Sequence, residues 1–226
     1  MKTTIVLGTR PEIIKLSPLI KQLNKKNTSV IFTGQHYDYN MSMHFIDQLG
    51  LDKPNYSMKI PSTNPSLQIA EIIQKLSKIL EKEKPETVIV QGDTNTVLAA
   101  GVASLKSQIP ISHIESGLRS CDWRMPEEHN RITVDHFSDF LFAPTQINKQ
   151  NLISEKVHGK IFVTGNTVID AINQFSKISK KQSKLSIDYD DYVLLTLHRS
   201  ENVDNKLILS SIIKSILDSN QKFIFP

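Results

Sequence analysis

Cysteine is almost absent from the sequence, with Cys121 the only one among 226 residues, so an intramolecular disulfide framework is excluded. The sequence also lacks an apolar run near the roughly 20 residues that a membrane-spanning helix needs. The N-terminal stretch MKTTIVLGTRP is apolar only briefly before its glycine, which is typical of a strand and too short for a signal peptide. These absences predict a cytoplasmic protein with no membrane partner.

Sequence motifs for common cofactors and metals are missing as well. Neither the P-loop GxxxxGK(S/T) nor the dinucleotide motif GxGxxG occurs, which disfavours nucleoside triphosphate hydrolysis and dinucleotide binding. The metal motifs HExxH and CxxC are absent too, although His129, Asp135 and His136 lie close together in the sequence. We therefore expect neither a cofactor nor a metal site.

The net charge is mildly positive, because the sequence has 27 Lys and Arg residues and 23 Asp and Glu residues, which gives a formal net charge of +4. The lysines are scattered along helix-like segments and no aromatics interleave with them, so we expect no nucleic-acid partner. The densest basic run, KISKKQSK at 177–184, lies in a polar stretch that is typical of a linker. A mildly basic chain suits a small anionic substrate.

Short β-branched runs alternate with longer segments of helical period along the chain. TTIVLG is followed by PEIIKLSPLIKQLN, TVIVQGD by TNTVLAAGVASLK, and KIFVTGN by TVIDAINQF. Nearly continuous apolar strands separated by helices indicate a parallel sheet that is covered on both faces. The sequence thus predicts an α/β, doubly wound, Rossmann-like fold.

The alternating pattern divides the chain into three parts. Residues 1–175 predict one Rossmann-like domain, and residues 176–189 form a polar linker. Residues 190–226 then restart the pattern with DYVLLTLHR, a helical segment and KFIFP. A strand–helix–strand unit cannot bury its own faces, so this last part predicts the start of a second, truncated Rossmann-like domain.

Polar side chains gather where the predicted strands end, and in open α/β sheets the ligand crevice lies outside those ends. In the first of these loops, Arg10 and Lys15 accompany a helix N-terminus, an arrangement suited to binding phosphate. An ordinary strand-to-helix turn with surface charges explains the same residues. His198 follows the restarted strand and holds the equivalent position in the second unit.

Four carboxylates follow strand ends or open a helix. Asp93 comes after TVIVQG and can serve as a helix N-cap, or it can face the crevice. Glu115 follows ISHI, where a solvated loop acid is the alternative. Glu127 and Glu128 open a helix behind Pro126, where the helix dipole favours acids. An anion-binding edge that faces carboxylates suits proton transfer on a phosphorylated or nucleotide-linked substrate.

Eight motifs occur in an order that resembles the non-hydrolysing UDP-N-acetylglucosamine 2-epimerases. They are GTRPEIIKLSP, TGQHYDYN, VQGDTNTVLA, HIESGLRS, MPEEHNR, FAPT, VTGNTVIDA and LTLHRSENVDN. The resemblance implies two Rossmann-like domains of the GT-B type with a cleft between them. It also implies interconversion of UDP-N-acetylglucosamine (UDP-GlcNAc) and UDP-N-acetylmannosamine (UDP-ManNAc) for surface polysaccharide synthesis, in an enzyme that is typically a homodimer.

The implied isomerase reaction eliminates UDP across C1–C2 and adds it back with protonation on the other face. Carried over by motif, Arg10, Lys15, Asp93, Glu115 and His198 match substrate-binding residues. The matching catalytic residues are Asp93, Glu115, Glu127 and His198.

The sequence departs from the family in ending at Pro226, within the second domain, so we expect weak or no activity from the 226-residue chain alone. An inactive remnant or binding subunit is therefore one alternative. Another is an epimerase of a related UDP-amino sugar. A GT-B glycosyltransferase gives no reason for this set of carboxylates.

Overall fold

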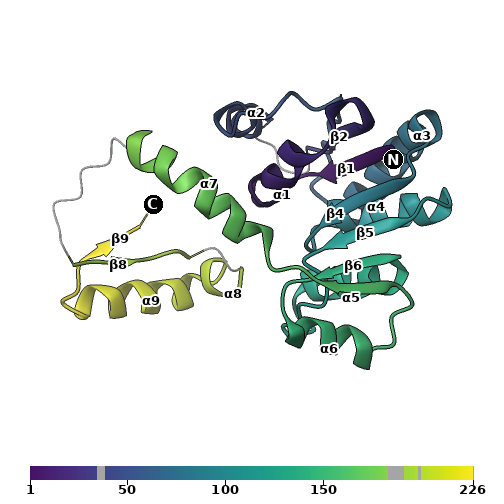
Figure 1. Ribbon diagram of the computed structural model, residues 1–226. Helices are drawn as coiled ribbons and strands as arrows, with labels where there is room; N and C mark the ends of the chain where they lie inside the picture. The colour runs from purple at the N-terminus through teal and green to yellow at the C-terminus, as the bar shows by residue number, and fades with distance from the viewer. Residues whose placement is uncertain (35–38, 183–190, 198–199, 226) are drawn as a thin grey trace. The chain divides into compact units, whose positions relative to one another are not determined.

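The computed structural model describes residues 1–34, 39–182, 191–197 and 200–225 (Figure 1). The chain divides into two compact units, Met1–Lys180 and Lys181–Pro226. We refer to them as the first unit and the second unit. None of the described helices is long and apolar enough to cross a membrane.

A seven-stranded parallel sheet forms the centre of the first unit. Its strands are β1 (Thr3–Leu7), β2 (Thr28–Phe32), β3 (Tyr56–Ser57), β4 (Thr87–Gln91), β5 (Ile111–Ile114), β6 (Phe140–Ala143) and β7 (Lys160–Val163). The spatial order is β3-β2-β1-β4-β5-β6-β7, and every neighbouring pair is parallel. The order therefore reverses between β1 and β4, which is the place where doubly wound sheets open a ligand crevice.

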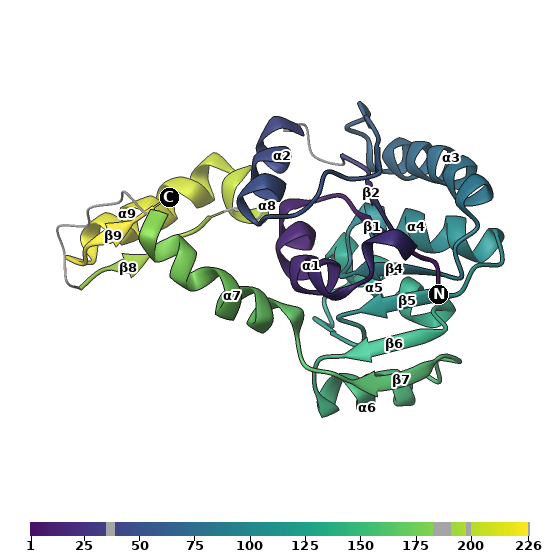
Figure 2. The same cartoon turned by 45° about the horizontal axis from the view of Figure 1, so that its top comes forward.

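Helices cover both faces of this sheet (Figure 2). They are α1 (Arg10–Gln22), α2 (Tyr39–Gln48), α3 (Pro65–Glu83), α4 (Asn95–Lys106), α5 (Pro126–Phe137) and α6 (Gln146–Ser154). A short 3₁₀ helix spans Lys25–Asn27, and helix α7 (Thr167–Gln182) follows β7. Helices α1 and α2 pack on one face with Ile5 and Leu7, whereas α3 and α4 pack on the other with Val6. The expected α/β, doubly wound, Rossmann-like fold is confirmed.

Burial on both faces explains why the strand sequences are apolar without alternation. All five residues of β1 and of β4 are buried, because successive side chains point into the two opposite helix layers. Fully burying a Val, Leu or Ile side chain contributes about 1.5–3 kcal/mol. The centre of the sheet is therefore a rigid base for the loops that follow its strands.

The second unit is smaller and more open. It holds β8 (Val193–Leu194), α8 (Ser200–Val203), α9 (Lys206–Asp218) and β9 (Phe223–Ile224), and the two strands pair in parallel. Helix α7 stays helical through Gln182, past the start of the linker predicted at 176. The domain limits derived from the sequence stay a prediction.

Candidate active site at the carboxyl edge of the sheet

The loops after β1, β4 and β5 lie side by side, because these three strands are neighbours in the sheet. Gly8, which follows β1, is tightly enclosed. A Cβ atom there would lie 2.1 Å from Thr96 Oγ1 and 2.5 Å from Thr33 Oγ1. Glycine thus lets the first loop pass close to the N-terminus of α4, which brings the β1 and β4 loops together.

Lys15 and Glu115 form the central ion pair of this edge. The Lys15 ammonium donates to both carboxylate oxygens of Glu115, at 3.0 and 2.7 Å. The side-chain amides of Gln91 and Asn166 also donate to Glu115, the latter at 3.2 Å. Since the Glu115 side chain is only 10% exposed, three donors from separate elements hold its carboxylate in one orientation.

The backbone at Glu115 is also unusual, with a φ of +68° in the left-handed region that few non-glycine residues adopt. The amide N–H groups of Glu115 and Ser116 both donate to the carbonyl of Phe142 in β6, at 3.1 and 3.2 Å. The turn therefore directs the Glu115 side chain across the edge toward Lys15 of α1. Strained conformations of this kind are concentrated at functional sites.

Asp93 forms an ion pair with Arg131 of α5. Its carbonyl accepts a hydrogen bond from the Asn130 amide at 2.9 Å, so α5 holds both ends of this residue. The N-cap of α4 is Thr94, whose hydroxyl accepts from the Val97 amide at 3.3 Å. The prediction that Asp93 caps α4 is therefore wrong. Its carboxylate is instead held at the edge by the ion pair with Arg131.

The adjacent glutamates at the start of α5 have opposite environments. Glu128 is buried and accepts hydrogen bonds from the backbone amides of Ser120, at 3.1 Å, and Cys121, at 3.0 Å, and from Arg131. Burial acts to raise the pKa of Glu128, but these donors hold it below its usual range. Glu127 is exposed, and no hydrogen bond or ion pair joins its side chain to another described residue.

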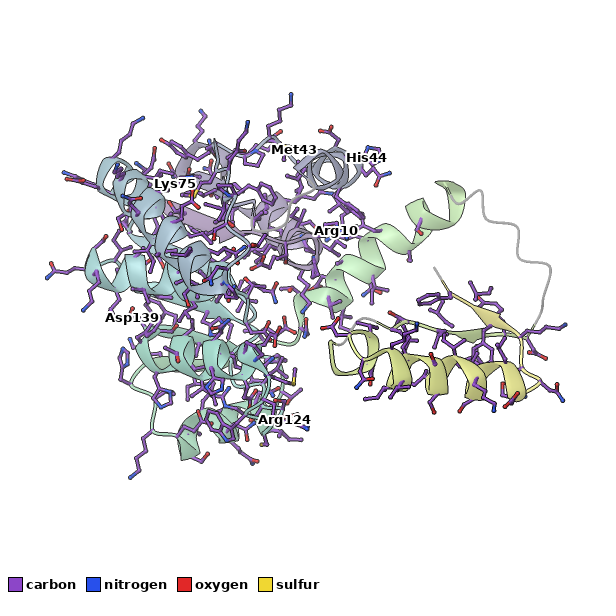
Figure 3. All side chains as sticks on the ribbon, turned by 180° about the vertical axis from the view of Figure 1, so that it is seen from behind. Arg10, Met43, His44, Lys75, Arg124 and Asp139 are labelled. Carbon is purple, nitrogen blue, oxygen red and sulfur yellow. The ribbon has the colours of Figure 1, made fainter. Side chains whose placement is uncertain are left out.

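Arg10 and His198 are the remaining two residues predicted for the site. Arg10 is exposed at the start of α1, with its guanidinium carbon 5.9 Å from the centre of the Phe45 ring of α2 (Figure 3). His198 lies outside the described residues. The structure thus joins Lys15 directly to Glu115 and places Asp93 on a neighbouring loop, while Glu127 opens the helix that binds Asp93.

Several residues of the site were not singled out from the sequence. Gln91 is the last residue of β4 and Asn166 follows β7, so the position of polar residues at strand ends could have identified both. Arg131 belongs to the motif MPEEHNR, but its partner Asp93 is 38 residues away in the chain. Only the packing of α5 against the β4 loop reveals that pair.

Glu12 is a buried carboxylate beneath the first loop. It accepts hydrogen bonds from the amides of Gly8 at 2.8 Å and Thr9 at 2.6 Å, and from the Thr94 hydroxyl at 2.9 Å. Burial raises the pKa of Glu12 despite these donors. Because Thr94 comes from the β4 loop, Glu12 fastens the two loops to each other.

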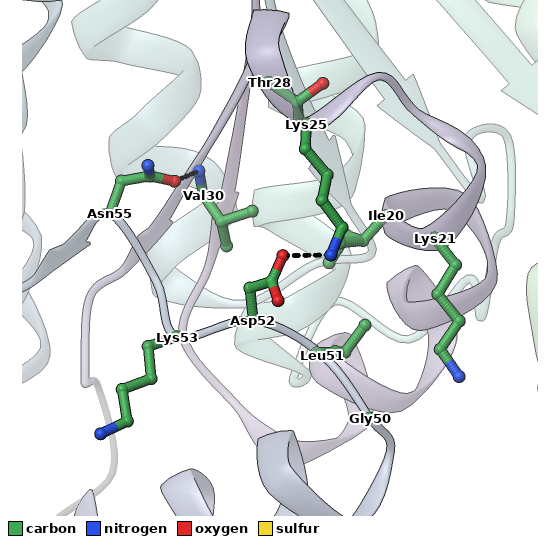
Figure 4. Close-up of a pocket in the computed structure, with 10 residues that line it drawn as sticks. All are labelled: Ile20, Lys21, Lys25, Thr28, Val30, Gly50, Leu51, Asp52, Lys53 and Asn55. Carbon is green, nitrogen blue, oxygen red and sulfur yellow. Dashed lines mark hydrogen bonds and ion pairs between the residues drawn. The ribbon is translucent and has the colours of Figure 1, made fainter.

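A separate cavity of about 170 Å³ lies near the start of β2, away from the carboxyl edge (Figure 4). The ion pair between Lys25 and Asp52, at 2.5 Å, lies in its lining. None of the described residues predicted for the site lines this cavity. Among the described residues, no three His, Cys, Asp or Glu side chains are grouped in a way that could hold a metal ion.

Comparison with known proteins assigns this arrangement to a family. The family described as UDP-N-acetylglucosamine 2-epimerase matches residues 20–226. The UDP-N-acetylglucosamine 2-epimerase of Methanocaldococcus jannaschii is 48% identical over 96% of this chain and 62% of its own length. The chain belongs to the UDP-N-acetylglucosamine 2-epimerase family, as the resemblance predicted.

A solved structure and a second relative extend this comparison. The crystal structure of the M. jannaschii enzyme in complex with UDP-GlcNAc and UDP matches with a TM-score of 0.90 and 46% identity, over 100% of this chain and 65% of that chain. A UDP-2,3-diacetamido-2,3-dideoxy-D-glucuronate 2-epimerase of Pseudomonas aeruginosa is 38% identical over 96% of this chain and 62% of its own length. The chain thus spans less than two thirds of the length of these relatives.

Proposed function

We propose that this protein interconverts UDP-GlcNAc and UDP-ManNAc by epimerisation at C2, in the supply of precursors for surface polysaccharides. The observation that supports this best is the Lys15–Glu115 ion pair beside Asp93, at the carboxyl edge of a chain that belongs to the 2-epimerase family. The proposed reaction eliminates UDP across C1–C2 to a 2-acetamidoglucal. UDP then adds back while C2 is protonated from the opposite face.

The steps of this reaction need different chemical groups at the carboxyl edge. Removal and return of the C2 proton need carboxylates on both sides of the sugar, and we assign them to Asp93, Glu115 and Glu127. The leaving diphosphate needs positive charge, which Lys15 and Arg10 supply beside the N-terminus of α1. His198, which the family resemblance matches to a catalytic and substrate-binding residue, is proposed to take part in both roles.

The Lys15–Glu115 pair has a consequence for binding. An incoming diphosphate competes with Glu115 for the Lys15 ammonium, because this cation has only three donors. Substrate binding would therefore loosen Glu115 from its cation, while Gln91 and Asn166 keep the carboxylate in place. In this way the binding of the leaving group and the freeing of a proton-transfer group are connected.

Proton NMR of UDP-GlcNAc in D₂O tests the reaction, because each turnover replaces the C2 proton by deuterium. Two forms are compared: this chain alone, and this chain followed by the remaining segment of the M. jannaschii relative. We expect the extended form to exchange the C2 proton and to yield the manno sugar, and the chain alone to do so weakly or not at all. A folded extended form that leaves the proton in place would contradict the proposal and favour the non-catalytic binding subunit.

A second candidate substrate is a related UDP-amino sugar, as the similarity to the P. aeruginosa diacetamido-glucuronate epimerase suggests. The same exchange measurement with that sugar nucleotide separates the two. We expect UDP-GlcNAc to exchange faster, because the relative named for it shares more identity with this chain. The homodimer, the cytoplasmic location and the two-domain organisation belong to the same proposal.

A further inference from the structure

His113 of β5 is fully buried directly behind the candidate site, and the proposed function gives it no role. Its Nδ1 lies 2.7 Å from Oδ1 of Asp135 in α5, and its Nε2 lies 2.8 Å from the carbonyl oxygen of Gly92. Both side chains of the His113–Asp135 pair are 0% exposed. Water therefore cannot replace either partner of the imidazole ring.

The two partners determine which atoms carry protons. A carbonyl oxygen only accepts hydrogen bonds, so Nε2 must carry a proton to lie at 2.8 Å from Gly92. The other contact needs one proton between Nδ1 and the Asp135 carboxyl group. That proton belongs either to the ring, which is then an imidazolium, or to the acid.

The surroundings of Asp135 decide between these two forms. Its other oxygen, Oδ2, accepts from the Gly117 amide at 3.1 Å and lies 2.8 Å from Nη1 of Arg119. Burial acts to raise the pKa of Asp135, but His113 and Arg119 together hold it below its usual range. The proton therefore belongs on His113, and Arg119 is itself balanced by Glu155 at 2.5 Å.

We propose that His113 is a buried imidazolium that acts with Asp135 as a positioning pair and locks the loops of Asp93 and Glu115 to each other. One end of the pair binds the carbonyl of Gly92, the residue before Asp93. The other end binds the amide of Gly117, two residues after Glu115. The proton-transfer role of those carboxylates rests on the proposed function, whereas the bridge itself does not.

The loop after Glu115 is closely packed, which explains why a bond to Asp135 helps to hold it in place. Gly117 has a φ of +78°, and a Cβ atom there would lie 2.3 Å from the carbonyl oxygen of Asn148. The loop leaving Glu115 thus follows a path that few residues can adopt. A charge-assisted bond to Asp135 compensates for this restriction, because such bonds are roughly twice as strong as neutral ones.

NMR of the chain labelled with ¹⁵N-histidine tests the proposal without any enzyme activity. We expect one of the seven imidazole rings to carry protons on both nitrogens near neutral pH. This pair of signals should vanish in His113→Gln and persist in His136→Gln, a control histidine that is exposed on α5. A neutral ring at His113, with one N–H, would overturn the proposal.

Asp135→Asn provides a second readout, which also covers the case of a His113→Gln chain that fails to fold. We expect the Nδ1 proton signal of His113 to shift or disappear, and the Gly117 amide to exchange with solvent at least about tenfold faster. In the extended form, kcat should fall about 10–100-fold with little change in KM. An unchanged Nδ1 signal together with unchanged solvent exchange of the Gly117 amide would refute the bridge between the two loops. If the bridge is lost but kcat is unchanged, only the role of the bridge in the reaction is refuted.

Discussion

The two units of this chain differ in how far each buries its own side chains. The first unit places helices on both faces of its sheet, and its core residues, such as Leu76 of α3, are 0% exposed. In the second unit none of the described residues is buried, and Leu207 and Leu217 of α9 are 81% and 75% exposed. The comparison teaches that the described part of the candidate site depends on the first unit for its rigidity.

The largest expected effect contrasts one leucine from each unit. Leu76→Ala should lower the free energy of unfolding by about 2–5 kcal/mol, because it leaves a cavity between α3 and the sheet. Leu207→Ala should change it by no more than about 0.5 kcal/mol, because that side chain is already in solvent. Urea unfolding followed by circular dichroism measures both. Equal losses would show that the second unit is as well packed as the first.

A smaller effect separates the adjacent glutamates of α5. Glu128→Gln should cost about 1–3 kcal/mol of unfolding free energy, because the backbone amides of Ser120 and Cys121 lose the buried, charged acceptor that Glu128 provides. Glu127→Gln is the matched control, and its stability should stay within about 0.5 kcal/mol of the unchanged chain. In the extended form the same control should lose C2 exchange. If Glu127→Gln were less stable than Glu128→Gln, Glu127 would be the structural residue and Glu128 the candidate for proton transfer.

The pH dependence of Glu128→Gln sharpens this contrast. Since the folded state lowers the pKa of Glu128 from its ordinary value of 4.5, the carboxylate stabilises the fold above that value. This contribution is lost as the pH falls through the lowered pKa. The stability gap between Glu128→Gln and the unchanged chain should therefore narrow between about pH 6 and about pH 3 in urea titrations. A gap that widens on acidification would contradict the sign of the shift.

The smallest stability effect concerns Lys15, whose side chain is 26% exposed. Lys15→Gln should change the unfolding free energy by only about 0–1 kcal/mol, yet weaken the binding of UDP about tenfold. Lys214→Gln, in exposed α9 of the second unit, is the control and should bind UDP as before. Isothermal titration calorimetry distinguishes them. Equal weakening in both variants would mean that the diphosphate is held by net charge alone.

Local patterns in the sequence predicted most of the fold. Strands such as β1 and β4 are buried on both faces, so they form continuous apolar runs that the local sequence pattern predicts. The strand β3 was missed, because a Tyr-Ser pair of two residues carries no recognisable period. The solvent exposure of the apolar residues of α9 in the second unit could not be predicted, because the sequence pattern is the same for a buried and an exposed helix.

The candidate site was predictable only in part. Asp93, Glu115 and Lys15 follow from their positions at strand ends and in the first loop, together with the family resemblance. Their partners Arg131 and Asn166 come from distant parts of the chain, so their selection depends on how α5 and the β7 loop pack. Glu128 is buried and Glu127 is exposed because the loop at Ser120 folds back onto α5. Neither helix propensity nor hydrophobic periodicity in the sequence predicts that contact.

The most direct test of the central claim is a titration of the ¹⁵N-labelled chain with UDP-GlcNAc, followed through backbone amide shifts. If the carboxyl edge of the first unit is the substrate site, the amides of Gly8, Gly92 and Gly117 should shift most. Shifts confined to Leu51 and Asp52, beside the separate cavity, or to α9 of the second unit, would place the ligand elsewhere and contradict the account.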